Sequence, residues 1–222
     1  MQPNIKFSLI VTNYNKGLFI ARAIRSCLMQ LVIRQIVEVI VVDDGSTDNS
    51  MDVLNEFGGE IRVFQNKSNC GVSNASNIGL NNSSGEYWMR VDADDFLNMN
   101  ACTFMGSILE NNNEFGFVFS DHFRVDSNGI KIDRVSLSEE EILFEHGAGV
   151  LFRTQLLKDI GGYDESLRNC EDRDLLYRLK KIGVKGYHLP VPLYRYYIHG
   201  NNISQSKERN NYKKIVEQKH AI

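Results

Sequence analysis

The run from residue 37 to residue 42 constrains the fold more than any other segment of this 222-residue chain. It is almost wholly β-branched, is interrupted only by Glu38, and stops at two aspartates, Asp43 and Asp44. Strands of this composition are typically buried on both faces, as a central strand is in a parallel sheet covered by helices. The run therefore predicts an open α/β sheet.

Strand and helix patterns alternate through the first hundred residues, as such a sheet requires. Strands are predicted at 7–12, 37–42, 61–65 and 86–91, with helices at 17–31, 48–57 and 73–81. The second half is less regular. We expect helices at 100–110, 154–160 and 171–182, strands near 115–120, 149–152, 187–189 and 193–197, and a polar loop or hairpin at 121–141. Without a repeat or a linker, residues 1–222 are read as a single domain.

Carboxylates gather where the predicted strands end. Asp92, Asp94 and Asp95 lie within four residues of one another, directly after the strand at 86–91. Like charges at this spacing repel one another, and hard divalent cations such as Mg²⁺ prefer carboxylate ligands. A solvated acidic turn is the alternative interpretation. Ligands of open α/β sheets bind beyond the carboxyl ends of the strands, where both acidic clusters and the polar 12–15 loop converge, and this favours a ligand site.

Composition sets broader limits. The formal charge of −3 gives no general reason to expect a nucleic-acid partner. Four cysteines without pairing or metal-ligand spacing, and no signal-peptide or membrane-spanning pattern, predict a cytoplasmic protein. The 205–222 tail is basic, with five basic against two acidic residues from 207 onward. Both a solvated helix and peripheral contact with the inner face of an anionic membrane are open interpretations of this tail.

Seven segments, in order over residues 6–204, resemble the family-two glycosyltransferases with the GT-A nucleotide-sugar-binding fold. They are Ser-Leu-Ile-Val-Thr-Asn-Tyr-Asn-Lys, Val-Ile-Val-Val-Asp-Asp-Gly-Ser-Thr-Asp, Asn-Cys-Gly-Val-Ser-Asn-Ala-Ser-Asn-Ile-Gly, Gly-Glu-Tyr-Trp-Met-Arg-Val-Asp-Ala-Asp-Asp, Ile-Gly-Gly-Tyr-Asp-Glu, Cys-Glu-Asp-Arg-Asp-Leu and Tyr-Arg-Tyr-Tyr-Ile-His-Gly-Asn-Asn-Ile-Ser. Each segment alone is a weak signal, whereas the ordered set is specific.

The resemblance implies an α/β fold with a mostly parallel central sheet flanked by helices. It assigns residues 1–98 to a nucleotide-sugar-binding half and 99–204 to an acceptor-binding half, followed by the basic 205–222 tail. The implied reaction is an inverting transfer of a hexosyl or N-acetylhexosaminyl group from a UDP- or dTDP-linked sugar. The acceptor would be a hydroxyl of a growing glycan or a lipid-linked saccharide, and the implied cofactor is Mn²⁺ or Mg²⁺.

By the same resemblance, five residues bind the donor nucleotide. Thr12 and Tyr14 would form the pocket for the base, and Asp44 would accept a hydrogen bond from the base N–H, which suits uracil or thymine. Asn74 and Asp92 complete the set, with Asp92 near the ribose. The acidic pair at 43–44 is also a suitable turn and helix cap, and the two roles are compatible.

Three further roles follow from the resemblance. Asp94, the second aspartate of the family's Asp-x-Asp motif, would bind the metal, as would His199. Asp172 would be the general base. Each has an ordinary alternative: His199 as a surface or core residue, and Glu171 with Asp172 as an acidic first helical turn. Asp95 is expected to cap the helix that follows.

One departure from the family pattern concerns the donor site. Many relatives carry arginine where this chain has Ser76, and Arg90 and Arg168 are candidates to replace that cation.

A catalytically inactive nucleotide-sugar-binding protein is the main alternative function, although the presence of both Asp94 and Asp172 argues against it. A phosphoacceptor receiver domain would place its acidic pair after the first strand and would be shorter. A dinucleotide dehydrogenase would need Gly-x-Gly-x-x-Gly after the first strand, where Thr-Asn-Tyr-Asn stands.

Overall fold

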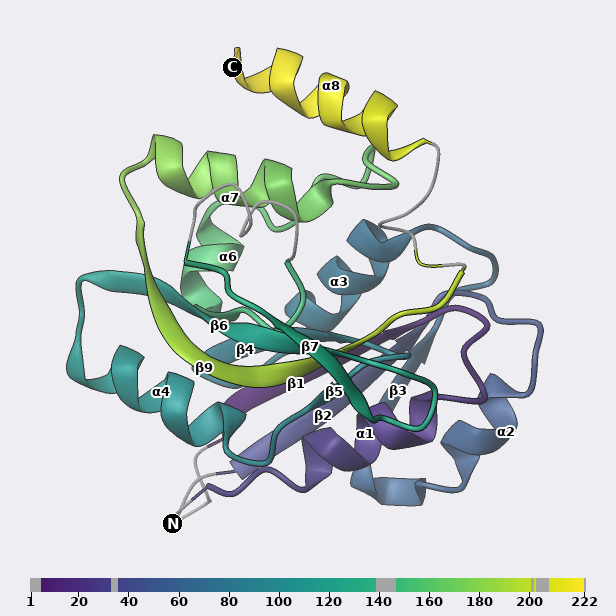
Figure 1. Cartoon of the computed structure of the whole chain (residues 1–222). Helices are drawn as coiled ribbons and strands as arrows, with labels where there is room; N and C mark the ends of the chain where they lie inside the picture. The colour runs from purple at the N-terminus through teal and green to yellow at the C-terminus, as the bar shows by residue number, and fades with distance from the viewer. Residues whose placement is uncertain (1–4, 33–35, 139–146, 201, 203–207, 222) are drawn as a thin grey trace.

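The computed structural model describes residues 5–32, 36–138, 147–200, 202 and 208–221 (Figure 1). The strands of the described residues form one sheet in the order β3-β2-β1-β4-β8-β6-β9-β5, with β7 paired to β6. Their bounds are β1 (Ile5–Asn13), β2 (Ile36–Asp43), β3 (Arg62–Gln65), β4 (Tyr87–Asp92), β5 (Phe96–Leu97), β6 (Phe115–Val125), β7 (Lys131–Val135), β8 (Leu151–Arg153) and β9 (Lys185–Tyr197). The helices are α1 (Ile20–Leu28), α2 (Ser50–Asn55), α3 (Val72–Asn81), α4 (Ala101–Asn111), α6 (Thr154–Asp159), α7 (Glu171–Lys181) and α8 (Arg209–His220), with a 3₁₀ turn η1 (Gly58–Glu60).

The part of the sheet formed by β1, β2, β3 and β4 is parallel, as the sequence predicts. β1 lies between β2 and β4 and runs parallel to both, and β3 extends the parallel part beyond β2. The register places Asn13 beside Asp43 and Thr12 beside Asp92. The polar residues that follow three different strands therefore meet at one edge. Beyond β4 the sheet is mixed, since β8 is antiparallel to both β4 and β6, whereas β6 and β9 are parallel.

Alternation along the strands divides the core into two layers, one on each face of the sheet. On β1, Leu9 and Val11 pack with α1, α2 and α4, whereas Ile10 packs with α3, α6 and α7. Figure 1 shows these two sets of helices on opposite sides of the sheet. Because successive side chains of a strand point to opposite faces, covering both faces requires a continuous apolar strand. This explains why residues 37–42 of β2 are almost all apolar.

The second half departs from the prediction at three places. The strands expected at 187–189 and 193–197 are one long strand, β9, which curves across the front of the molecule in Figure 1. The register of β6 against β9 shifts between Ser120 and His122, beside the prolines 190 and 192, which have no N–H to donate. Ile182, the last residue of the helix expected at 171–182, follows the end of α7 and is 60% exposed. The two-residue strand β5 was not predicted.

The predicted polar hairpin is present in the part of 121–141 that the structure describes. β6 and β7 form its arms, and the Gly129 N–H donates to the Asp126 carbonyl in the turn. Residues 139–141 of that prediction lie outside the described residues.

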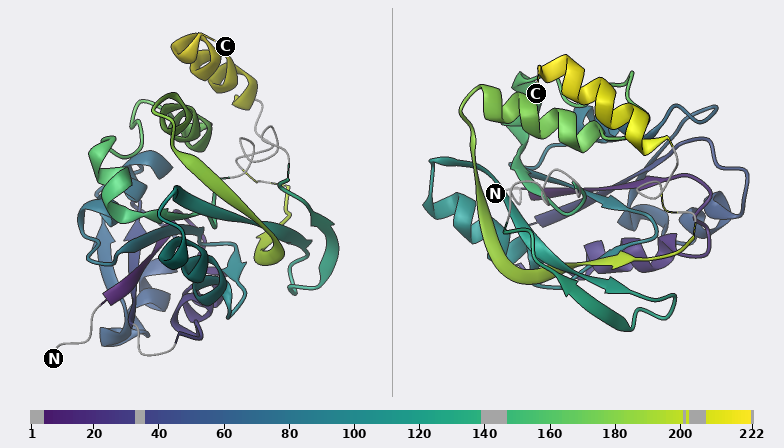
Figure 2. Two further views of the ribbon diagram at one scale, coloured as in Figure 1. Left: turned by 90° about the vertical axis from the view of Figure 1, so that its left-hand side faces the viewer. Right: turned by 45° about the horizontal axis from the view of Figure 1, so that its top comes forward.

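The basic tail forms α8, which lies along α7 (Figures 1 and 2). Val216 is fully buried there against Leu167 and Cys170. Lys219 contacts Asp164 at 2.6 Å and Asp174 at 2.7 Å. The described part of the tail is therefore docked on the domain, and residues 205–207 and 222 lie outside the described residues. In the described part of the chain, every helix is too short or too polar to cross a membrane.

Candidate active site

A cavity of about 630 Å³ opens at the carboxyl ends of β1, β2 and β4 and extends to the first turn of α7. It is lined from the donor half by the end of β1, the 69–75 segment and the acidic end of β4, and from the second half by β6, β7, β9 and α7. Six of the eight predicted site residues line it, namely Thr12, Tyr14, Asp44, Asp92, Asp94 and Asp172, whereas Asn74 and His199 are not part of the lining. The structure thus brings together groups that are up to 160 positions apart in the chain.

Asp44 organises the loop that leads into α3. Its Oδ1 accepts hydrogen bonds from Asn66 Nδ2 and the Cys70 N–H, both at 2.8 Å, and its Oδ2 accepts one from the Gly71 N–H at 2.7 Å. An ionised carboxylate offers about four acceptor sites, so one remains for a ligand. Asp43, its neighbour, has a turn role, because its carboxylate accepts from the Ser46 N–H at 2.9 Å.

The other four predicted nucleotide contacts are placed differently from one another. Thr12 Oγ1 donates to Asp92 Oδ1 at 3.3 Å, as their paired register allows. Tyr14 is 42% exposed at the rim, where its ring is available to stack on a base. Asn74 lies outside the cavity lining and bridges Asn66 and Glu165, so in this structure it supports the loop from behind.

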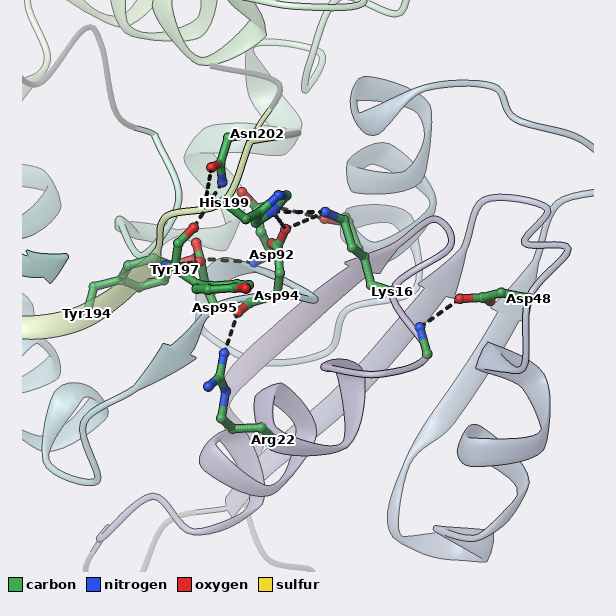
Figure 3. Close-up of polar contacts among 12 residues, drawn as sticks. Lys16, Arg22, Asp48, Asp92, Asp94, Asp95, Tyr194, Tyr197, His199 and Asn202 are labelled. Carbon is green, nitrogen blue, oxygen red and sulfur yellow. Dashed lines mark hydrogen bonds and ion pairs between the residues drawn. The ribbon is translucent and has the colours of Figure 1, made fainter. Parts of the chain in front are cut away.

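Asp94, His199 and Lys16 form a compact group close to the N-terminus of α1 (Figure 3). Asp94 Oδ2 lies 2.6 Å from Lys16 Nζ and 2.9 Å from His199 Nε2, and the two nitrogens are 3.2 Å apart. Burial opposes ionisation of Asp94, but the Lys16 charge and the hydrogen bonds from Lys16 and His199 outweigh it and lower the pKa of this carboxyl. An ionised carboxylate is therefore maintained where the sequence predicts a metal ligand.

The donor set of this group fits a divalent cation. A carboxylate oxygen and an imidazole nitrogen that share one position are suitable ligands for Mn²⁺, while Mg²⁺ favours the oxygen. Lys16 shows that the site already attracts positive charge. Among the described residues no cluster of three or more histidine, cysteine or acidic side chains surrounds a single point.

Asp95 does not cap the following helix, so that expectation is wrong. Its side chain is 1% exposed, and it accepts hydrogen bonds from the Tyr197 N–H and the Tyr194 hydroxyl, both at 2.8 Å (Figure 3). Burial, followed by the charges of Asp94 and Asp92, raises the pKa of Asp95 well above its usual range. Asp95 ties β9 to the end of β4, and the N-cap position of α4 belongs to Asn100.

Asp172 enters the cavity from the first turn of α7, beside an arginine. Arg90, on β4, lies 2.7 Å from Asp172 Oδ2, 3.0 Å from Glu171 Oε1 and 3.2 Å from Asp92 Oδ1. Burial and the neighbouring charge of Asp172 raise the pKa of Glu171 to about 8. Glu171 and Asp172 both line the cavity, and the Asp172 side chain is the more exposed of the two.

Comparison with known proteins identifies the family. Residues 8–161, well over half of the chain, match the model described as Glycosyl transferase family 2. The chain belongs to this family. Hyaluronan synthase of Pasteurella multocida is 29% identical over 210 residues, which are 90% of this chain but 21% of that synthase. The chain thus spans about a fifth of the length of this relative.

Solved glycosyltransferases share the fold. TarS of S. aureus, in complex with UDP-GlcNAc, superposes with a TM-score of 0.80 at 22% identity, covering 96% of this chain and 66% of that one. A mannosyltransferase from Pyrobaculum calidifontis, in complex with GDP-Man and Mn²⁺, gives 0.69 at 18% identity, covering 97% and 61%. At these identities the likeness concerns the fold alone, and it confirms the expected α/β GT-A fold.

Several residues of this site were not assigned their positions from the sequence. Lys16 follows a recognised motif, but nothing in its spacing indicates that it reaches Asp94. Arg90 and Arg168 were considered as substitutes for the arginine that many relatives carry at the position of Ser76. Arg168 lies 3.2 Å from Asn69 Oδ1, in the segment that leads into α3, whereas Arg90 contacts Asp172. An arginine inside an otherwise apolar strand was the available signal for Arg90. Gly147, discussed below, gave no signal at all.

Proposed function

We propose that this domain transfers a sugar from a nucleotide-diphospho-sugar to a hydroxyl group of a glycan or lipid-linked acceptor, with inversion at the anomeric carbon. One observation carries the proposal. Asp94, which follows β4 and contacts His199, and the candidate base Asp172, on α7, line the same cavity. This arrangement suits a transfer in which one group stabilises the departing diphosphate while another removes the proton of the attacking hydroxyl.

The donor would bind along the β1, β2 and β4 edge. Asp44 keeps one acceptor site, which suits the N3–H of uracil or thymine, and Tyr14 would cover the base. A UDP- or dTDP-linked sugar is therefore our first choice. TarS, which shares the fold, was solved with UDP and with UDP-GlcNAc, and this agrees with a uridine donor.

The diphosphate would lie against Asp94, His199 and Lys16. Asp94 and His199 would hold Mn²⁺ or Mg²⁺, which when bound stabilises the negative charge that grows on the departing diphosphate. Lys16 would leave Asp94 as the metal binds and add a second positive charge beside the phosphates. Asp92, bonded to Thr12, would orient the ribose.

Asp172 would take the proton of the acceptor hydroxyl as its oxygen attacks the anomeric carbon. A general base of this type contributes about 10²–10⁴-fold to the rate when it lies within hydrogen-bonding distance of the proton. Attack in line with the departing diphosphate inverts the anomeric centre in one displacement. One carboxylate is then sufficient, and no covalent sugar–enzyme intermediate is needed.

A panel of sugar nucleotides tests the proposal, with hydrolysis and transfer measured in the presence of Mn²⁺ or Mg²⁺ and again after chelation by EDTA. We expect at least one uridine- or thymidine-linked donor to turn over and the activity to disappear in EDTA. Asp94→Asn should lose the same activity, because it removes the anionic ligand. Undiminished turnover in EDTA would contradict the metal role. Donor binding by calorimetry without any turnover would favour the inactive-binder alternative.

A further inference from the structure

We propose that Arg90 is the positioning residue for the base: its buried guanidinium fixes the carboxylate of Asp172 against the backbone of Gly147 and connects it to the donor motif through Asp92. This inference rests on the proposed function, since it assumes that Asp172 is the base.

The position of Arg90 is unusual for a charged residue. It lies in the middle of β4 between Met89 and Val91, both fully buried, and is itself only 3% exposed. An apolar residue would fill this place at lower cost, because moving a charge out of water costs several kcal/mol unless partners compensate. An arginine there indicates a requirement that packing alone does not explain.

Its partners come from two separate parts of the fold. Asp92 belongs to the end of β4, whereas Glu171 and Asp172 begin α7, about eighty positions later. The planar guanidinium presents several N–H groups in a fixed arrangement, so it can orient more than one carboxylate at once. Tyr163, whose ring centre is 5.7 Å from the guanidinium carbon, covers one side of the group.

The charges of Asp172, Asp92 and Glu171 more than offset the burial of Arg90 and raise its pKa well above the usual range. Arg90 is thus a permanent cation. It binds Oδ2 of Asp172, while Oδ1 has no hydrogen-bond partner in the part of the chain that the structure describes. Arg90 therefore fixes the carboxylate of Asp172 through Oδ2.

Gly147 closes the other side of the same carboxylate. A Cβ atom built on Gly147 would lie 1.9 Å from Asp172 Cγ and 2.3 Å from Oδ2, which is far too close for any side chain. The Asp172 carboxylate thus occupies the space that a side chain at 147 would take. Between this backbone and Arg90 it has little freedom to rotate.

The test compares Arg90→Met, Arg90→Lys and Asp172→Asn, together with the double variant Arg90→Met/Asp172→Asn. Arg153→Met is the matched control, because Arg153 lies on the neighbouring strand β8 and bonds only to backbone carbonyl groups among its described partners. Each variant is checked for folding by circular dichroism, and kcat, donor KM and the donor dissociation constant are measured with the full chain.

We expect Arg90→Met to lower kcat by about 100-fold, the effect of misplacing a catalytic group by about 1 Å, with donor affinity changed less than about threefold. Arg90→Lys keeps the charge but not the planar fork, and should recover part of that loss. In the Asp172→Asn background, Arg90→Met should cost no more than about twofold in residual transfer, because residues that act as one unit are not additive. Arg153→Met should leave kcat near that of the unchanged protein.

Three outcomes would overturn the positioning role: kcat near normal in Arg90→Met, a parallel loss of donor affinity, or multiplicative losses in the double variant. If Arg90→Met does not fold, the kcat and donor KM of Arg90→Lys test the proposal instead. An increase in donor KM with unchanged kcat counts against it. The proposed function fails separately. Near-normal transfer by Asp172→Asn would remove Asp172 as base, whatever Arg90 does.

Discussion

At the scale of single residues, the position of Asp172, the proposed base, depends on the absence of a side chain at Gly147. Gly147→Ala would place a methyl group within 2 Å of the Asp172 side chain, so the carboxylate must move or the backbone must shift. We expect kcat to fall by about 100-fold while donor binding is retained, since the three atoms nearest to the added methyl group all belong to Asp172. Gly59→Ala is the control, because a Cβ there meets nothing within 4 Å. Steady-state kinetics and donor calorimetry measure both effects, and equal kcat values for the two variants would contradict the account.

The residue scale also shows where sequence reasoning ends. Asp44, Asp94 and Asp172 could be selected because each falls within a segment that resembles a motif of the family. Asp95 stands beside Asp94 and was misread, because its partners, Tyr194 and the backbone of Tyr197, are about a hundred residues away. A contact of that sequence separation leaves no local pattern.

At the scale of elements, α8 packs against α7, the helix that carries Asp172, the proposed base. Val216 packs against Leu167 and Cys170, and Cys170 directly precedes Glu171 in the chain. Val216→Asp would place a charge in this apolar contact. We expect it to lower the free energy of unfolding by about 3 kcal/mol. Transfer should fall, and amide hydrogen exchange of residues 163–172 should rise, while donor binding persists. Ile215→Asp is the matched control, because Ile215 is 47% exposed on the same helix. Equal exchange in the two variants would show that α8 does not support this loop.

Strand and helix positions in the first half were predictable because β1, β2 and β4 are largely apolar runs that end at turn residues. The second half was harder, since β9 is amphipathic and changes its pairing along its length. The tail illustrates the same limit: its basic composition suggested a solvated or membrane-bound helix, whereas Lys219 and His220 contact Asp174 on α7. Membrane contact through the tail stays a prediction.

At the scale of the whole molecule, two halves that differ in regularity share one cavity. The parallel half supplies the donor edge through β1, β2 and β4, and the mixed half supplies α7 and β9. Asp95 joins β9 to the end of β4, and Arg90 joins β4 to α7, through buried polar contacts. The resemblance to a family could indicate both halves, but only the structure shows how they are connected.

The central claim is that Asp172 removes the acceptor proton and does not hold the donor. The most direct test is to compare Asp172→Asn with the unchanged protein, measuring the donor dissociation constant by calorimetry and the transfer rate with an identified donor and acceptor. The account predicts a dissociation constant within about threefold of normal and a transfer rate lower by about 10²–10⁴-fold. Transfer at a near-normal rate, or loss of donor binding equal to the loss of transfer, would contradict it.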